Sequence, residues 1–182
     1  MPFHMGVFGS GRVFLTPPAS VPDGTQAYVY MLGEGEDAVS FYRRLVLIEP
    51  EDARLYTLLG RAQLESGRLA DAEASLSRAV QLDFGYAEAH FHLGRCYTAQ
   101  GQRDSAASSF HKAADLAPDE ALYHRHYIEA LIGLEEPDAV FEALANGLAG
   151  APRLRTWAES DPALTALHDD PRWAELFAEG EN

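Results

Sequence analysis

Residues 53–86 read ARLYTLLGRAQLESGRLADAEASLSRAVQLDFGY, and residues 87–120 read AEAHFHLGRCYTAQGQRDSAASSFHKAADLAPDE. Written one above the other without a gap, the two stretches place like residues at matching positions, among them Leu59 over Leu93, Gly60 over Gly94, Gly67 over Gly101 and Ala72 over Ala106. Self-similarity at a fixed spacing is typical of proteins built from stacked structural repeats. The period of 34 residues therefore decides the fold of this chain.

Each copy has the periodicity of two amphipathic helices. Gly67 and Gly101 separate the two helices of their copies, where a residue with a positive φ closes a tight turn. Gly60 and Gly94 fall inside a helix, where Gly costs about 1 kcal/mol relative to Ala. We therefore expect a neighbouring helix to approach closely at these two positions. Apolar residues recur at helical three- and four-residue steps, as at Leu69, Ala72, Leu76 and Ala79.

The repeat extends beyond these two copies in both directions. Residues 121–154 follow the same spacing more loosely, with Tyr127-Ile128 where the other copies have Leu-Gly. Upstream, residues 35–52 match the second half of a copy and predict one helix of a decayed repeat. We expect the repeats to occupy residues 35–154.

These residues resemble the tetratricopeptide repeat (TPR) family, whose copies hold Leu-Gly, aromatic, small and Pro residues at fixed offsets. Residues 53–86 depart from the pattern with Phe84 where Pro is usual. The resemblance implies an all-α fold, a right-handed superhelical solenoid of antiparallel helix pairs. Residues 87–120 carry the fullest match, with Leu93, Gly94, Tyr97, Ala106, Phe110, Ala113 and Pro118.

The two ends of the chain have other patterns. Residues 1–34 hold strand-like runs at Gly6–Phe8 and Arg12–Thr16, and they predict an extended or partly ordered arm. Residues 25–32 allow either a strand or a helix. Within 155–182, two Asp-Pro pairs predict helix starts. We expect short helices over 162–168 and 171–179 that cap the apolar end of the stack.

The amino-acid composition limits the classes of binding partner and the cellular compartment that we expect for this protein. The net charge of −14 over 182 residues opposes binding to nucleic acid and to anionic membrane surfaces. The single cysteine, Cys96, excludes an internal disulfide, and its repeat position predicts a buried, inert thiol. No run is apolar and long enough for a membrane span, and the N-terminus lacks a signal-peptide pattern. We expect a soluble, cytoplasmic protein.

Four of the seven histidines form two His-x-His pairs one period apart, His90/His92 and His124/His126. Positions i and i+2 of a helix diverge by about 200°, so one pair cannot hold one metal ion. Packing of His90 and His124 at a helix interface is the favoured interpretation. A weak two-His site across repeats and a pH-sensitive ligand contact stay open. Of the carboxylates, we place only Glu129 near these pairs, three residues after His126.

In families of this kind, the first helix of each repeat lines a concave face. Arginines on that face present planar forks suited to carboxylates, which predicts a groove for a peptide with an acidic residue or a free C-terminal carboxylate. Alternatively, the arginines pair with Glu65, Glu88 and Glu129. The Lys and Asn set with which TPR domains hold chaperone tails is absent. The resemblance assigns to the groove Arg54, Thr57, Arg61, Leu64, Glu65, Glu88, Phe91, Arg95, Thr98, Ala99, Leu122, Arg125, Glu129, Ile132 and Gly133.

No Ser/His/Asp arrangement, nucleotide loop or HExxH pattern indicates catalysis, and no pattern calls for a cofactor or a resident metal. The resemblance implies a non-enzymatic adaptor or scaffold that binds a protein or peptide. Two alternatives remain: a homo-oligomeric structural module that assembles through the arm or a repeat face, and a regulatory or substrate-holding subunit of a separate enzyme.

Metal content distinguishes the interpretations of the histidine pairs. Because the two histidines of a pair diverge on one helix, protein purified without a polyhistidine tag is expected to hold no stoichiometric zinc or nickel by plasma mass spectrometry. A His92→Ala/His126→Ala variant is the matched control. One equivalent of metal that this variant loses would contradict the packing interpretation.

Overall fold

The computed structural model describes residues 5–8, 12–15, 31–32 and 38–178. Three short strands, β1 (Met5–Phe8), β2 (Arg12–Leu15) and β3 (Met31–Leu32), form an antiparallel sheet in the order β1-β2-β3. In its register Val7 pairs with Val13 and Phe14 with Met31. Both strand-like runs of the sequence are strands. The rest of the predicted arm, including 25–30, lies outside the described residues.

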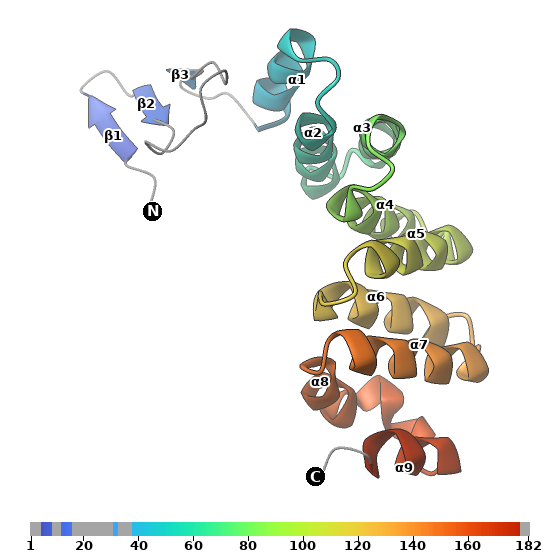
Figure 1. Cartoon of the computed structure of the whole chain (residues 1–182). Helices are drawn as coiled ribbons and strands as arrows, with labels where there is room; N and C mark the ends of the chain where they lie inside the picture. Colours follow the sequence, from blue (N-terminus) through green and yellow to red (C-terminus); the bar gives the residue numbers. More distant parts are fainter. Residues whose placement is uncertain (1–4, 9–11, 16–30, 33–37, 179–182) are drawn as a thin grey trace.

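Helices make up residues 38–178, and they follow one another along a stack from the α1 end to the α9 end (Figure 1). The expected all-α solenoid is confirmed for this part. Within the stack, α2 packs against α3, α4 against α5 and α6 against α7, and α2 also contacts α4. The helices are α1 (Ala38–Ile48), α2 (Ala53–Glu65), α3 (Leu69–Leu82), α4 (Ala87–Ala99), α5 (Arg103–Leu116), α6 (Ala121–Ile132), α7 (Pro137–Gly150), α8 (Leu154–Ser160) and α9 (Pro171–Ala178).

The turns inside the helix pairs share a left-handed residue. Gly67 has φ 73° and Gly101 has φ 76°, as their places in the repeat predict. One period later the same place is held by Glu135, with φ 60°. A residue with a Cβ pays about 1 kcal/mol for this conformation, so the third turn keeps the shape of the other two at a cost in stability.

The helix-interior glycines are positions of close approach, as the sequence predicts. A Cβ on Gly60 would lie 2.5 Å from Leu76 Cγ, and one on Gly94 would lie 2.7 Å from Phe110 Cδ1. Real Cβ atoms do not come this close to a neighbour, so only Gly lets α2 meet α3, and α4 meet α5, at this spacing.

The third pair solves the same packing problem with different residues. Ile128 stands where the other copies have Gly, and it is fully buried together with Leu144. In this pair the glycine at a position of close approach is Gly147, on the second helix, α7. A Cβ on Gly147 would lie 2.6 Å from Leu154 Cδ2. The close contact therefore joins α7 to α8 in this copy.

The C-terminal end differs from the sequence expectation in two respects. An additional helix, α8, precedes the two Asp-Pro pairs, and the segment Pro162–Leu167 is a 3₁₀ helix rather than an α-helix. Both Asp-Pro pairs do start helices. Asp161 Oδ1 accepts a hydrogen bond from the Ala163 amide at 2.9 Å, and Asp170 Oδ1 accepts one from Arg172 at 2.9 Å.

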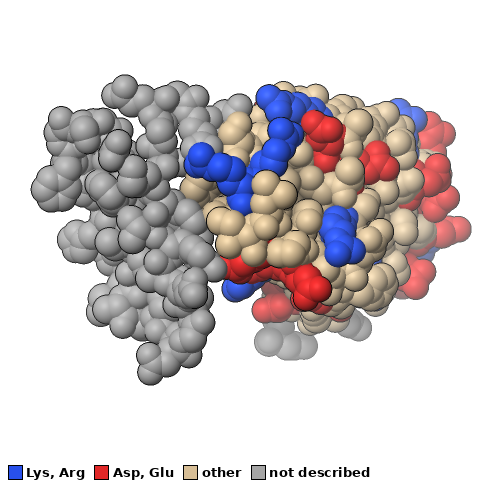
Figure 2. Space-filling view, turned by 90° about the horizontal axis from the view of Figure 1, so that it is seen from above, with Lys and Arg blue, Asp and Glu red and all other residues tan. Residues whose placement is uncertain are grey.

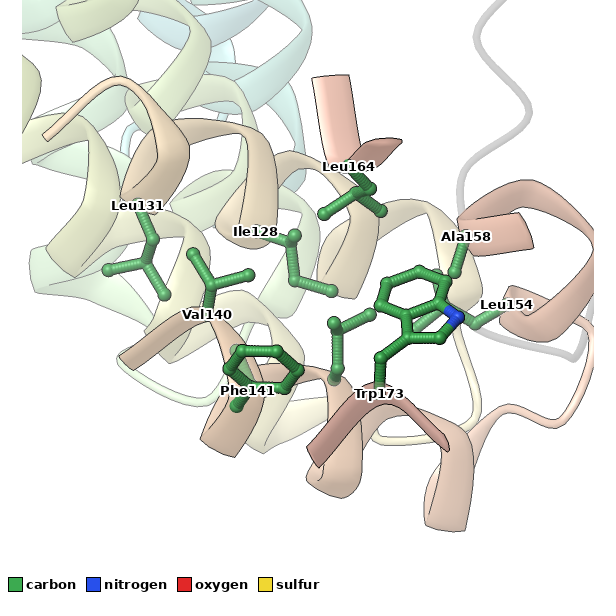
Figure 3. Close-up of a cluster of buried hydrophobic side chains, with 10 residues drawn as sticks. Ile128, Leu131, Val140, Phe141, Leu154, Ala158, Leu164 and Trp173 are labelled. Carbon is green, nitrogen blue, oxygen red and sulfur yellow. The ribbon is translucent and has the colours of Figure 1, made fainter. Parts of the chain in front are cut away.

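A single apolar cluster closes this end of the stack (Figure 3). Trp173 of α9 lies among side chains from α6, α7, α8 and the 3₁₀ helix, and it is 9% exposed. Burying a large apolar side chain contributes about 1.5–3 kcal/mol. The last repeat therefore does not present its apolar face to water. The buried members are Ile128, Leu131, Val140, Phe141, Ala143, Leu144, Leu154, Ala158, Leu164 and Trp173.

Gly94→Ala is expected to destabilise the fold by about 1–3 kcal/mol, the usual cost of overpacking, although Ala is the better helix former. The new Cβ would meet the Phe110 ring at 2.7 Å. Urea unfolding followed by circular dichroism measures the change. Ala74→Gly, at an exposed position of α3, is the control, because it reports the propensity difference of about 1 kcal/mol in the same fold. A Gly94→Ala variant as stable as the parent would contradict the close approach.

Candidate functional site

The first helices of the pairs, α2, α4 and α6, bring charged and aromatic side chains together on one face, which we call the α2–α4–α6 face. Arg61 of α2 lies 4.0 Å from Glu88 of α4. Phe91 of α4 stacks against α6, with ring centroids 4.9 Å from Tyr123 and 5.2 Å from His126. Successive repeats therefore share this face through direct side-chain contacts.

A network of five charged or polar side chains connects α2 to α4. Glu88 Oε1 lies between Arg61 Nη1 at 4.0 Å and His92 Nε2 at 3.6 Å, while Tyr86 donates its hydroxyl to Glu88 Oε2 at 2.7 Å. Arg95 Nη1 lies 3.5 Å from His92 Nδ1. Arg has no acceptor, so Nδ1 accepts and the His92 proton sits on Nε2, toward Glu88.

A second group of the same kind lies on α6. Arg125 Nε donates to Glu129 Oε1 at 2.8 Å, and His126 Nδ1 lies 3.1 Å from Glu129 Oε2. The Arg125 guanidinium also lies over the Trp157 ring, 5.4 Å from its centroid. The face thus continues onto α8, and the expected neighbourhood of Glu129 and His126 is confirmed.

One partner on this face was missed by the sequence analysis. His92 does have a carboxylate one helical turn away, but it is Glu88, which precedes it rather than follows it. The i−4 spacing carries the same information as i+4. A search in both directions along the helix finds this pair from the sequence alone.

Several residues expected in the groove belong to the fold instead. Thr57 is 1% exposed and donates its hydroxyl to the Ala53 carbonyl at 2.9 Å, so it offers nothing to a ligand. Leu64 packs on the core cluster of α3 and α4. Ile132 packs on the C-terminal cluster. Arg54 differs from these three, because its side chain is 76% exposed; it pairs at 3.1 Å with Asp52, the N-cap residue of its own helix.

The outer members of the expected set are exposed but lie at the edges of the network. Leu122 is 44% exposed, and Thr98 is exposed while its hydroxyl donates to the Gly94 carbonyl at 3.0 Å. Glu65 is exposed and lies 3.9 Å from Arg61. Ala99 and Gly133 are exposed at the ends of α4 and α6. The structure therefore gathers Arg61, Glu88, Phe91, Arg95, Arg125 and Glu129, together with His92, Tyr123 and His126.

The pKa values of both histidines on this face are lowered. Burial lowers the pKa of His92 to about 4, and the charges of Arg95 and Arg61 act in the same direction against Glu88. Burial also lowers the pKa of His126, assisted by Arg125 and Arg95 and opposed by Glu129. Both imidazoles are therefore neutral at pH 7, and the arginines carry the positive charge of the face.

Arg95 differs from its neighbours in lacking a carboxylate. Arg61 and Arg125 each form ion pairs, which agrees with the alternative that these arginines are paired within the chain. Within residues 38–178, Arg95 has no ion pair; it contacts His92 and lies 6.0 Å from the centroid of the Phe91 ring. On the surface seen from the α1 end, basic and acidic side chains lie close to one another (Figure 2).

The other two histidines of the His-x-His pairs serve the fold. His90 and His124 are 5% and 6% exposed. Each donates from Nε2 to a turn carbonyl at 3.0 Å, His90 to Phe84 and His124 to Pro118. Packing at the helix interface, as expected, accounts for both. The part of the chain that the structure describes holds no group of three metal-ligating side chains.

Cys96 is a buried thiol, as its repeat position predicts. It is 0% exposed, and its Sγ lies 3.4 Å from the Leu69 carbonyl oxygen, to which it donates. Burial and the charge of Glu73 raise its pKa, so the thiolate, the reactive form, is disfavoured.

A model of the tetratricopeptide repeat matches residues 30–83 and 63–127, which together cover more than half of the chain. The chain belongs to the tetratricopeptide repeat family. Among its relatives, the Hsp70-Hsp90 organizing protein of Triticum aestivum is 25% identical over 155 residues. That alignment covers 82% of this chain and 26% of the relative, so this TPR chain spans about a quarter of the relative's length.

Solved structures share the TPR fold. MamA superposes with a TM-score of 0.58 at 22% identity, over 65% of this chain and 69% of that chain. The first TPR of Spaghetti, bound to the Hsp90 peptide SRMEEVD, gives a TM-score of 0.52 at 20% identity, over 53% of this chain and 77% of that one. At sequence identities of 20–22%, the similarity to these structures shows a shared fold. In the described segments, no helix combines the length and the apolar character needed to span a bilayer.

Stability of this TPR stack is expected to decrease as the pH falls from 6.5, the ordinary pKa of His, toward 4. His92 has a folded-state pKa of about 4, so the unfolded chain takes up the proton first and unfolding is favoured. The full effect for His92 is about 3 kcal/mol. Urea unfolding at a series of pH values measures it.

His92→Gln is expected to flatten this pH dependence. Arg95→Gln should flatten it too, since Arg95 lowers the pKa of both His92 and His126. Arg103→Gln, which removes an exposed arginine at the start of α5, is the matched control. Equal slopes in the parent and in His92→Gln would show that His92 is not held neutral by the fold.

Proposed function

We propose that this chain is a non-enzymatic interaction module that binds a protein segment on the α2–α4–α6 face, with Arg95 as the central contact. Arg95 is half-buried on the middle helix, and it has no carboxylate partner among the described residues. A guanidinium in that position is stabilised by a carboxylate that accepts two parallel hydrogen bonds. The missing carboxylate is the observation that carries the proposal.

The neighbours of Arg95 favour an anionic group at that place. His92 is neutral at pH 7, so its Nδ1 accepts from Arg95 and no positive charge of its own repels the guanidinium. Arg61 and Arg125 lie on the adjacent helices; Arg61 lies within 4.0 Å of Glu65 and Glu88, and Arg125 pairs with Glu129. The carboxylates of Glu65, Glu88 and Glu129 thus lie beside Arg61 or Arg125, and Arg95 at the centre is left without one among the described residues.

The aromatic residues under Arg95 supply an apolar floor. Phe91 is 6% exposed and contacts the rings of Tyr123 and His126 on α6. Such packing fixes the ring, so a ligand meets a preformed surface, and a preformed surface reduces the entropy lost on binding. The binding segment therefore needs a carboxylate for Arg95 and an apolar portion for the floor.

The ligand class that follows is a peptide with an acidic side chain or a free C-terminal carboxylate. The Spaghetti TPR, with the same fold, is bound to the peptide SRMEEVD, which has acidic residues and ends in Asp. This chain lacks the Lys and Asn set of chaperone-tail clamps, so the proposal names the chemistry and not that partner. The net charge of −14 repels anions at long range, which leaves selection to the local arginines. A cytoplasmic location and the absence of a cofactor belong to the same proposal.

A library of random heptapeptides with free C-termini tests this function. Peptides retained on the immobilised protein and identified by mass spectrometry are expected to be enriched in Asp and Glu. Arg95→Ala should weaken binding of a retained peptide at least about tenfold, the usual effect of losing a hydrogen bond to a charged group. Fluorescence anisotropy measures the dissociation constant.

Control variants distinguish binding at the α2–α4–α6 face from an effect of the net charge of the protein. Arg103→Ala changes the net charge equally but lies on α5, so it should bind like the parent. Arg61→Ala/Arg95→Ala should bind more weakly than Arg95→Ala. No acidic enrichment, or equal affinity of the Arg95 and Arg103 variants, would refute the proposed function.

A further inference from the structure

A cavity of about 520 Å³ lies between α5, α6 and α7, and none of the α2–α4–α6 face residues lines it. Pro118 of the α5–α6 turn, His124 of α6 and Asn146 of α7 stand on its wall. It is therefore a separate feature of the molecule.

The preceding repeat shows what fills the equivalent place. One period upstream, Pro118, His124 and Asn146 correspond to Phe84, His90 and Lys112. There the Phe84 ring stands edge-on to His90, with centroids 5.3 Å apart and an angle of 88°. Lys112 Nζ lies 4.7 Å from the centroid of the same ring. The chain thus occupies that place with an aromatic side chain of its own.

The platform under the ring is retained in the later repeat. His124 donates from Nε2 to the Pro118 carbonyl at 3.0 Å, as His90 does to the Phe84 carbonyl at 3.0 Å. Equal hydrogen bonds hold the two imidazoles in equivalent positions. Pro118 supplies no aromatic ring at the place that Phe84 holds beside His90, and His124, 6% exposed, stands on the wall of the cavity.

The charge around the cavity is reversed. Lys112 is replaced by Asn146, while Asp115 and Glu142 stand where the preceding repeat has Gln81 and Ser108. Burial raises the pKa of Tyr127 on the cavity wall, and the charges of Glu142 and Asp115 act in the same direction. Asp115 lies 3.6 Å from His111, and Glu142 forms no ion pair within residues 38–178.

We propose that this cavity is a second recognition site, which takes an aromatic side chain carried next to a basic side chain on a partner protein. The ring lies on His124, in the place that Phe84 holds one repeat earlier, and the cation lies between Asp115 and Glu142. The site does not depend on the α2–α4–α6 face, so either site can fail its test while the other stands.

Titration of the ¹⁵N-labelled protein with N-acetyl-Phe-Arg-amide tests the site. Saturable shifts are expected at the amides of Tyr127, Glu142 and Asn146. N-acetyl-Ala-Arg-amide, which lacks the ring, and N-acetyl-Phe-Glu-amide, which reverses the charge, should each bind at least about tenfold more weakly. Absence of saturable shifts around α5–α7, or equal binding of the three peptides, overturns the proposal.

Two variants copy the preceding repeat into the cavity. Pro118→Phe supplies the ring that Phe84 provides upstream, and Asn146→Lys supplies the cation of Lys112; each should abolish the shifts. Asn146→Lys keeps the turn intact if Pro118→Phe does not fold. Binding that survives Asn146→Lys overturns the proposal. Light scattering tests whether a second copy of this chain fills the cavity with its own Phe84. If the protein self-associates and both Phe84→Ala and Asn146→Lys abolish the association, the proposal of a separate partner protein is overturned.

Discussion

The spacing of the helix pairs depends on a contact between the backbone of one helix and a large side chain of the next. Gly60 receives Leu76, and Gly94 receives Phe110, at distances that leave no room for a Cβ. Protein interiors are close-packed, so this contact sets how near the two helices of a pair lie. The positions of Arg61 on α2 and of Glu88 and Arg95 on α4 depend on that distance.

The contact also explains how the stack ends. In the third pair the glycine has moved to Gly147, where it receives Leu154 of α8. The third pair therefore packs closely against the C-terminal helices, and Trp173 completes their cluster. The cluster covers the apolar face of the last repeat at the C-terminal end of the stack, which is the role of a capping segment in a solenoid.

Some repeat positions have the same structural role in successive copies, whereas other positions contribute side chains to the exposed face. His90 and His124 make the same hydrogen bond to a turn carbonyl. Two positions away, His92 joins a charged network with Glu88 and Arg95. Burial of an imidazole between arginines keeps it neutral, so His92 adds no second positive charge beside the guanidinium of Arg95.

By itself, the sequence determined the all-α repeat architecture, the left-handed turns at Gly67 and Gly101, and the close approach at Gly94. These features depend on local conformation or on the repeat period, and aligning the copies of the repeat within the chain reveals them. Only the tertiary structure decided that Thr57 is buried and that Arg95 lacks a carboxylate while Arg61 and Arg125 have one. The helix α8 and the cavity above His124 also emerged only there. Exposure and pairing depend on which side chains of neighbouring repeats meet across the stack, and the spacing of residues along one chain does not specify those contacts.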